Sequence, residues 1–213
     1  GYWVDTHRQT TIEGLYAAGD VAGGCPQKYV TGALVEGEIA AKHIVETALS
    51  GDLELTADEE QQLLADKVSE YNAFLGEERP FFTVEELEEA MQKVMDQYAG
   101  GIGTHYQFNE KQLGMAEEKI KKLQILAKGL AAADMHELMF IYELKERLTV
   151  CLTVIAHLRA RKETRWHSFA ENLDYPEKSD AWLCYVNSKK NGDQITMIRR
   201  DLVKGGETYE HRD

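Results

Sequence analysis

The residue types that can do chemistry gather near the start of this 213-residue chain. Gly19 and Asp20 follow a short apolar run, and a glycine-rich crossing then leads into a run with helical spacing. A carboxylate after a strand can accept hydrogen bonds from sugar hydroxyls, and the unpaired N–H groups at a helix start favour negative charge. Glycine lets the backbone approach a ligand without a Cβ in the way. We therefore expect Gly19, Asp20 and the helix start to contact one bound cofactor.

Residues just before and within the predicted helix start extend this candidate site. They are Gln27, Lys28, Tyr29, Val30 and Thr31. Lys28 can contact an anionic substrate as a point charge. Plainer interpretations stand beside these, because a turn aspartate often caps its own backbone and a lysine before a helix is often merely exposed.

Two blocks resemble the fumarate reductase and succinate dehydrogenase flavoprotein superfamily. Residues 14–20, Gly-Leu-Tyr-Ala-Ala-Gly-Asp, resemble its second flavin-contacting segment. Residues 27–42 are closer to one branch, the adenylylsulfate reductase alpha subunits, which have a similar Lys-aromatic-x-x-Gly run before a Glu-Gly-x-Ile-Ala helix. Residues 161–165, Arg-Lys-Glu-Thr-Arg, with Asp174-Tyr-Pro176 downstream, are similar to the family's C-terminal helical domain. The resemblance covers most of residues 1–180.

The resemblance implies FAD as the cofactor. It makes Asp20 a hydroxyl acceptor for the ribityl chain, with Gly19 beside it, and it turns the segment Tyr29-Val-Thr31 toward the pyrimidine edge of the flavin. The same resemblance makes Gln27 and Lys28 the substrate-contacting, catalytic positions. The branch carries His-Lys where this chain has Gln27-Lys28, and a neutral amide cannot be protonated, so the substrate stays open.

The implied activity is an electron-pair exchange between flavin and a small anionic substrate, with single electrons passing to an iron–sulfur protein subunit. Adenylylsulfate, reduced to sulfite and AMP, is the substrate that the resemblance favours. A fumarate reductase or succinate dehydrogenase-like flavoprotein with another anionic substrate is the first alternative. The second is a non-enzymatic helical interaction module, in which Gly19-Asp20 is only a structural turn.

The strand–GxGxxG–helix unit that holds the FAD pyrophosphate in these flavoproteins does not occur in this sequence. Gly101-Ile-Gly103 lacks the third glycine, and the chain opens in Gly-Tyr-Trp-Val-Asp rather than in Met. We therefore expect a C-terminal part of a larger flavoprotein subunit, inactive by itself and completed by the remainder of that subunit.

The net charge of −13 argues against a nucleic-acid surface, which needs a basic face. Apolar residues make up 43% of the chain, but no run approaches the ~20 that a membrane-spanning helix needs, so we expect no membrane insertion. The three cysteines, Cys25, Cys151 and Cys184, have no metal-ligand spacing and no disulfide pattern. This usage fits the cytoplasm and predicts no metal site, which leaves any iron–sulfur cluster to another subunit.

The expected fold is α+β and mainly α. A remnant of an FAD-binding α/β domain, 1–50, is followed by the flavoprotein's C-terminal helical domain with a terminal hairpin, 51–213. Two short strands are predicted around Trp3-Val4 and residues 15–18. A helix over 31–49 should bury an apolar stripe made of Leu34, Val35, Ile39, Ile44 and Val45.

An antiparallel bundle of three or four helices is predicted over 56–162. Capping boxes at 56–59 and 83–86 open two helices, Arg79-Pro80 separates them, and Gly100 to Gly103 forms a flexible break. Two longer helices follow at 109–130 and 134–162, the second with Asp134 as its N-cap. The spacing predicts burial of Leu87, Leu144, Leu148 and Leu152. Asn191-Gly192 between alternating runs predicts the hairpin.

A basic cluster closes the last long helix, in an otherwise acidic chain. It consists of Arg159, Arg161, Lys162 and Arg165. Cationic side chains are favourable at a helix C-terminus. The alternative is a docking edge for the rest of the flavoprotein or for an acidic partner subunit.

Overall fold

The computed structural model describes residues 1–23, 29–48, 56–76, 81–165, 167, 169–192 and 194–202. The chain divides into two compact units, one built on Gly1–Thr56 and one spanning Ala57–Leu202. The predicted end of a segment at Arg79-Pro80 lies outside the described residues.

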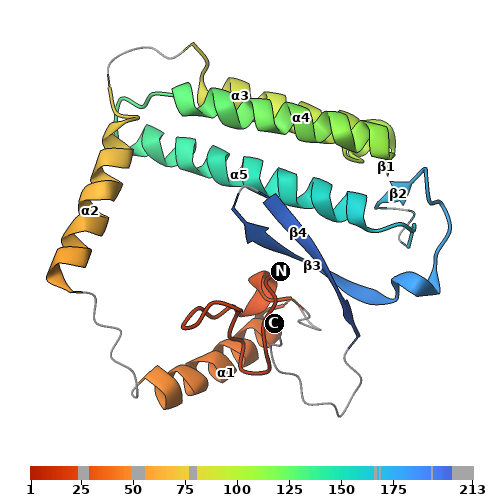
Figure 1. Ribbon diagram of the computed structural model, residues 1–213, viewed down its shortest axis with the longest axis horizontal. Helices are drawn as coiled ribbons and strands as arrows, with labels where there is room; N and C mark the ends of the chain where they lie inside the picture. The colour runs from red at the N-terminus through yellow and green to blue at the C-terminus, as the bar shows by residue number, and fades with distance from the viewer. Residues whose placement is uncertain are drawn as a thin grey trace. The chain divides into compact units, whose positions relative to one another are not determined.

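The first unit is a looped segment packed on helix α1, Val30–Ala48 (Figure 1). The two predicted strands do not form, because the loop pairs only in single bridges, Tyr2 with Ala22, Val4 with Thr10 and Gln9 with Tyr16. A 3-10 turn, η1, follows at Gly19–Val21. The predicted strand–turn–helix order is therefore realised as bridged loop, turn and helix.

Four of the five residues in the apolar stripe predicted on α1 are exposed and Ile39 is half-buried, so that part of the prediction was wrong. Leu34 is 69% exposed and Val45 is 62% exposed, whereas Glu36 and Ala40 on another face are buried. The loop approaches the helix so closely that a Cβ on Gly19 would lie 3.1 Å from the Ala33 Cβ. Such close contact admits small side chains and excludes a leucine stripe.

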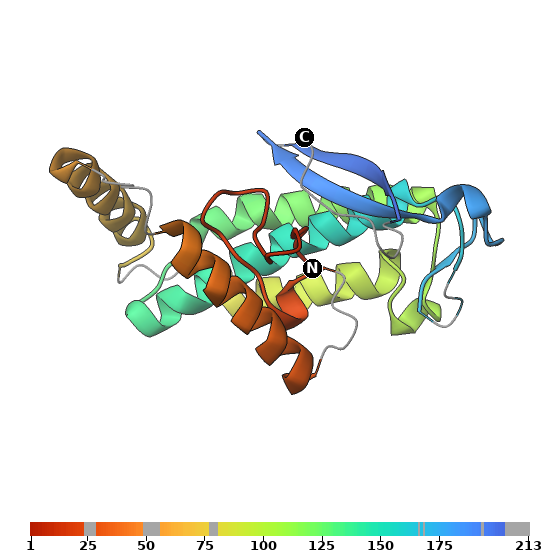
Figure 2. The ribbon, with the colours of Figure 1, turned by 90° about the horizontal axis from the view of Figure 1, so that it is seen from below.

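The second unit is built on three helices that all contact one another: α3, Val84–Tyr98, α4, Glu110–Leu126, and α5, Met135–Ala160 (Figures 1 and 2). The predicted capping box opens α3, since the Thr83 hydroxyl accepts from the Glu86 N–H and Glu86 accepts from the Thr83 N–H. Asp134 caps α5 by accepting two backbone N–H bonds. Local helix signals therefore predicted both starts.

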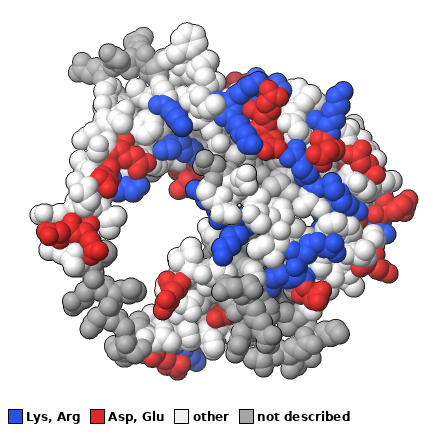
Figure 3. All heavy atoms as spheres, viewed as in Figure 1, with Lys and Arg blue, Asp and Glu red and all other residues white. Residues whose placement is uncertain are grey.

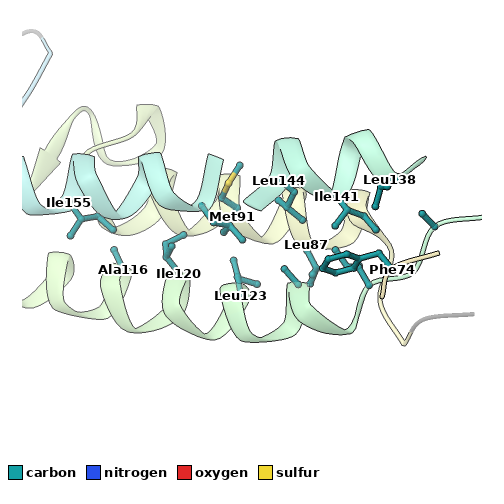
Figure 4. Close-up of a cluster of buried hydrophobic side chains, with 14 of the residues drawn as sticks. Phe74, Leu87, Met91, Ala116, Ile120, Leu123, Leu138, Ile141, Leu144 and Ile155 are labelled. Atoms are coloured by element: carbon teal, nitrogen blue, oxygen red, sulfur yellow. The ribbon is translucent and has the colours of Figure 1, made fainter. Parts of the chain in front are cut away.

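The bundle core lies where the three helices face one another. Leu87, Leu144 and Leu148 are at most 2% exposed, as predicted, and Leu152 is half-buried at the edge of the core. Figure 4 shows side chains of α3, α4 and α5 converging on this core. Those that it labels on the three helices are Leu87, Met91, Ala116, Ile120, Leu123, Leu138, Ile141, Leu144 and Ile155.

Helix α2, Ala57–Asn72, begins where the sequence predicts but does not lie along the bundle. It has no buried residue, and Leu63, Leu64 and Val68 are more than half exposed. Only its end reaches the bundle, where the Tyr142 hydroxyl donates to Glu70 at 2.7 Å. Figures 1 and 2 show α2 leaving the bundle at one end. Of the three or four helices predicted for the bundle, three therefore pack together and α2 does not join them.

The glycine-rich segment after α3 is a tight turn rather than a flexible break. The Asp96 carbonyl accepts from the Gly101 N–H at 3.2 Å, and its carboxylate accepts from the Gly103 N–H at 2.9 Å. A Cβ on Gly101 would lie 2.3 Å from the Asp96 Cα, so glycine is required by close approach. The turn η2, Ile102–Thr104, leads into strand β1, Gln107–Phe108, which pairs in parallel with β2, Glu171–Asn172.

The segment after α5 is organised around buried Glu163, which is 4% exposed. Its carboxylate binds Arg161 at 2.7 Å and Arg165 at 2.8 Å and accepts the Ser179 N–H at 2.9 Å. Burial would raise the pKa of Glu163, but the hydrogen bonds from Arg165, Ser179 and Arg161 prevail and lower it to about 2. Arg161 also donates to the carbonyls of Trp182 and Cys184, which ties α5 to the last strands.

The basic cluster is therefore occupied inside the unit. Arg159 pairs with Glu110 and Glu117, Lys162 lies 3.7 Å from Glu110, and Arg161 and Arg165 share Glu163. On the face in Figure 3, basic and acidic side chains lie beside one another over the second unit. Each of the four cations therefore has a carboxylate partner within the unit.

The C-terminal hairpin forms as predicted. Strand β3, Cys184–Asn191, pairs antiparallel with β4, Gln194–Asp201, and Asn191 faces Gln194 across the turn. Gly192 has φ of 58°, a left-handed conformation that suits glycine. Among the described residues, no helix combines the length and the apolar character needed to cross a membrane.

We predict that Leu148→Ala lowers the free energy of unfolding by about 2–5 kcal/mol, because it opens a cavity at a side chain with no exposed surface. Chemical denaturation followed by circular dichroism measures this loss. Val150→Ala, at a position 59% exposed on the same helix, is the control and should change stability by less than about 0.5 kcal/mol. Equal losses would contradict the assigned core.

We predict that Glu163→Gln lowers stability at pH 7 by about 3 kcal/mol, because two arginines lose their shared charge. The Glu163 pKa is about 2 in the folded chain against an ordinary 4.5, so its stabilisation is present above 4.5 and disappears as the pH falls toward 2. Unfolding at several pH values should therefore show the two proteins converging between about pH 4.5 and 2. Glu118→Gln, at an exposed pair with Lys122, is the control and should leave the unfolding transition almost unchanged at every pH, because exposed ion pairs contribute little. A difference between the wild type and Glu163→Gln that does not change with pH would refute the account.

Candidate functional site

The turn η1 presents the predicted site residues from the first unit. Gly19 is buried with φ of 74°, and its N–H donates to the Glu36 carboxylate of α1 at 2.8 Å. Its carbonyl accepts the Ala22 N–H at 3.0 Å, which closes the turn. The left-handed backbone and the proximity of Ala33 together explain why glycine stands here. The structure thus fixes the backbone just before Asp20 against α1.

Asp20 itself faces outward. Its side chain is exposed, and within the described part of the chain no hydrogen bond joins its carboxylate to the backbone of its own turn. The interpretation of Asp20 as a self-capping turn residue therefore finds no contact to support it there. Its oxygens remain available to accept hydroxyl hydrogen bonds from a ligand.

The start of α1 lies next to this turn, since Gly19 contacts Ala33 in the helix's first turns. Tyr29 is 79% exposed and Val30 is 75% exposed, and Thr31 is exposed as well. The Tyr29 carbonyl accepts the Ala33 N–H at 3.0 Å, so the helix begins at these residues. Gln27, Lys28 and Cys25 lie outside the described residues.

Glu36 is the residue that sequence reasoning missed. It is 5% exposed, and in addition to Gly19 it meets Arg8, whose Nη1 lies 3.3 Å from its second carboxylate oxygen. The signal was present in the Val-Glu-Gly-Glu run, where a charged residue stands three positions after Ala33 and four before Ala40, both small. That spacing puts all three on one helix face.

The loop is also held to α1 further along the helix. The Tyr16 hydroxyl lies 2.7 Å from His43 Nδ1, and the rings of His7 and His43 stack with centroids 4.3 Å apart. Asp5 accepts the backbone N–H groups of His7 and Gln9 and so shapes the loop's first turn. These contacts give the site a support that the isolated bridges alone do not provide.

Other reactive groups of the described chain form no second centre. Cys151 and Cys184 are free and half-buried, and burial raises the pKa of the Cys151 thiol. His157 contacts the Ser188 hydroxyl at 3.0 Å, and burial lowers the pKa of His157. Among the described residues no group of three His, Cys, Asp or Glu side chains could hold a metal ion.

No family model matches the chain. Over 195 residues it is 28% identical to the adenylylsulfate reductase subunit alpha of Megalodesulfovibrio gigas, a match that covers 86% of this chain and 29% of that protein. Over 188 residues it is 29% identical to an uncharacterised FAD-dependent oxidoreductase of Methanocaldococcus jannaschii, covering 85% of this chain and 32% of that protein. The chain therefore spans about a third of the length of these relatives.

The solved adenylylsulfate reductase of Archaeoglobus fulgidus matches 94% of this chain and 33% of its own with a TM-score of 0.82 and 34% identity. A quinol fumarate reductase chain of E. coli matches 99% of this chain and 37% of its own with a TM-score of 0.80 and 19% identity. The second match carries fold information alone. The chain is thus homologous to the C-terminal region of the adenylylsulfate reductase alpha subunits, and it shares its fold with the fumarate reductase chain.

We predict that Gly19→Ala loosens the first unit more than Gly14→Ala does. Both glycines have positive φ, so each substitution carries about 1–2 kcal/mol of backbone strain. Only at Gly19 does the new Cβ also meet a neighbour, at 3.1 Å, since nothing lies within 4 Å of one at Gly14. Hydrogen exchange over residues 1–23 and 29–48 measures the local opening. Equal protection in the two variants would contradict the close packing of Gly19 on α1.

Proposed function

We propose, from its homology to the C-terminal region of adenylylsulfate reductase alpha subunits, that this chain is the corresponding part of an FAD-dependent oxidoreductase. The observation that carries the proposal is the Gly19-Asp20 turn, held against the start of α1 with its carboxylate exposed. In this proposal residues 1–48 form one wall of a flavin site. The remainder of the flavoprotein subunit completes that site and provides the grip on the pyrophosphate.

The described residues fit a flavin's sugar chain. A carboxylate with open acceptor positions suits the ribityl hydroxyls, and Asp20 has no hydrogen bond to its own turn within the described chain. A buried glycine before it lets the backbone pass close to a ligand. A site closed by large side chains, or an Asp20 bonded into its own turn, would not have fitted.

The start of α1 has a separate role in the proposal. The first N–H groups of a helix have no partner within the helix and favour negative charge nearby. At Tyr29, Val30 and Thr31 these groups would stabilise charge at the pyrimidine edge of the ring and so raise its affinity for electrons. FAD, when bound, supplies the exchange of an electron pair with substrate and of single electrons with an iron–sulfur partner subunit.

The proposed substrate is a small anion, adenylylsulfate, which is reduced to sulfite and AMP. Identity of 28–34% to adenylylsulfate reductases supports this choice over fumarate, since the fumarate reductase match is 19% identical and reports the fold alone. Lys28 would bind the anion through its charge and Gln27 through its amide. A non-enzymatic module is not favoured, because homology to the reductases extends over 86% of the chain. A cytoplasmic location completes the proposal.

We predict that Asp20→Ala in the complete flavoprotein weakens FAD retention about ten- to a hundredfold, the effect of losing a charge-assisted bond of about 1.5–3 kcal/mol. Asp20→Asn keeps one acceptor oxygen and should lose less. Flavin absorbance after dialysis measures both. Full flavin occupancy in Asp20→Ala would remove Asp20 from the site.

Lys28→Ala is the matched contrast, because it should raise KM for adenylylsulfate while flavin content stays at the wild-type level. The pair of variants separates cofactor binding from substrate binding. An assay of adenylylsulfate beside fumarate, with the same preparations, tests the substrate. Turnover of fumarate alone would reject adenylylsulfate.

A further inference from the structure

We propose that Glu36 is the positioning residue that sets the orientation of Asp20, an inference that rests on the proposed flavin site. Glu36 belongs to α1, lies inside the first unit and is 5% exposed. Its carboxylate contacts the turn η1 at Gly19 and the preceding loop at Arg8. It acts through Gly19 rather than on the ligand. This role explains why a charged side chain, Glu36, is buried at a position where an apolar side chain would be enough to pack the helix.

A buried carboxylate is costly unless charged or hydrogen-bonding partners compensate it. Glu36 has both kinds. One oxygen accepts the Gly19 N–H at 2.8 Å, and the other lies 3.3 Å from the Arg8 guanidinium. Ala33 and Ala40 flank Glu36 on its face of the helix, so the carboxylate is the polar group that this part of the face directs toward Gly19 and Arg8, whereas His43 contacts the loop further along the helix.

Arg8 links Glu36 to the segment around Ala17, which precedes the turn η1. Its backbone is left-handed, with φ of 70°, and its carbonyl accepts the Ala17 N–H at 3.0 Å. The side chain of Arg8 contacts the Glu36 carboxylate, so Arg8 makes both contacts. The Arg8–Glu36 pair therefore connects three segments: the loop around residue 8, the approach to Gly19, and α1.

Glycine at 19 is free to adopt many backbone conformations, so a turn that contains it needs an external restraint. The bond from its N–H to Glu36 supplies that restraint, and the Ala22 N–H to Gly19 carbonyl bond closes the turn behind it. Asp20 lies between these two fixed points with its side chain outward. Removing the Glu36 acceptor would leave Asp20 present but no longer held in one direction.

The test uses the complete flavoprotein, with FAD affinity measured by fluorescence titration. Glu36→Ala should weaken FAD binding about tenfold although Asp20 is intact, because the orientation is lost. Glu36→Gln keeps an oxygen that can accept the Gly19 N–H and should lose only about threefold. Glu38→Ala is the matched control on the same helix, at an exposed pair with Lys42, and should change affinity by less than about twofold.

A double-mutant cycle separates positioning from simple stabilisation. In an Asp20→Ala background, Glu36→Gln and Glu36→Ala should cause almost no further loss, since the group that they orient is gone. Losses that add fully in that background would overturn the assignment and leave the flavin site standing. A wild-type flavoprotein that binds no FAD would overturn the proposed function and this inference together. If Glu36→Ala does not fold, the Gln variant in both backgrounds decides the question.

Discussion

The buried carboxylate of Glu36 connects the parts of the first unit that matter for its proposed function. It joins a helix to a glycine turn through the Gly19 N–H and to a loop through Arg8. Without that contact, the loop would meet α1 chiefly through small residues and the Tyr16–His43 contact, which lies further along the helix. Few apolar side chains are buried in the first unit, so the hydrogen bond and the ion pair of Glu36 determine how the loop is oriented on α1.

The second unit is held together differently. Its core is a layer of leucine and isoleucine side chains between three helices, and its C-terminal segment is organised by Glu163 and two arginines. Apolar burial tolerates rearrangement, whereas a shared carboxylate fixes the partners that meet there. The two units thus use one device, a buried glutamate with arginine, at the points where chain segments must meet in a defined way.

Sequence reasoning succeeded where structure is local. Thr83 and Asp134 cap helices with short-range bonds, and Gly192 sits in a two-strand turn, so neighbouring residues were sufficient to predict them. It failed where a distant segment decides. Most of the α1 stripe is exposed because the loop covers another face of the helix. The turn at Gly101 is a local failure, since Asp96 at the end of the preceding helix closes it and the glycine pattern alone did not reveal this contact. At the site, the pattern predicted Asp20 and the helix start but not Glu36, whose partners are 17 and more residues away.

The central claim is that residues 1–48 form one wall of a flavin site that a longer chain completes. The most direct measurement compares FAD binding by the complete gene product and by these 213 residues alone, using flavin absorbance after purification and fluorescence titration. The account predicts that the complete protein carries stoichiometric FAD and that the isolated chain, which lacks the GxGxxG unit, binds it weakly or not at all. A complete protein that neither retains nor binds FAD would contradict the account.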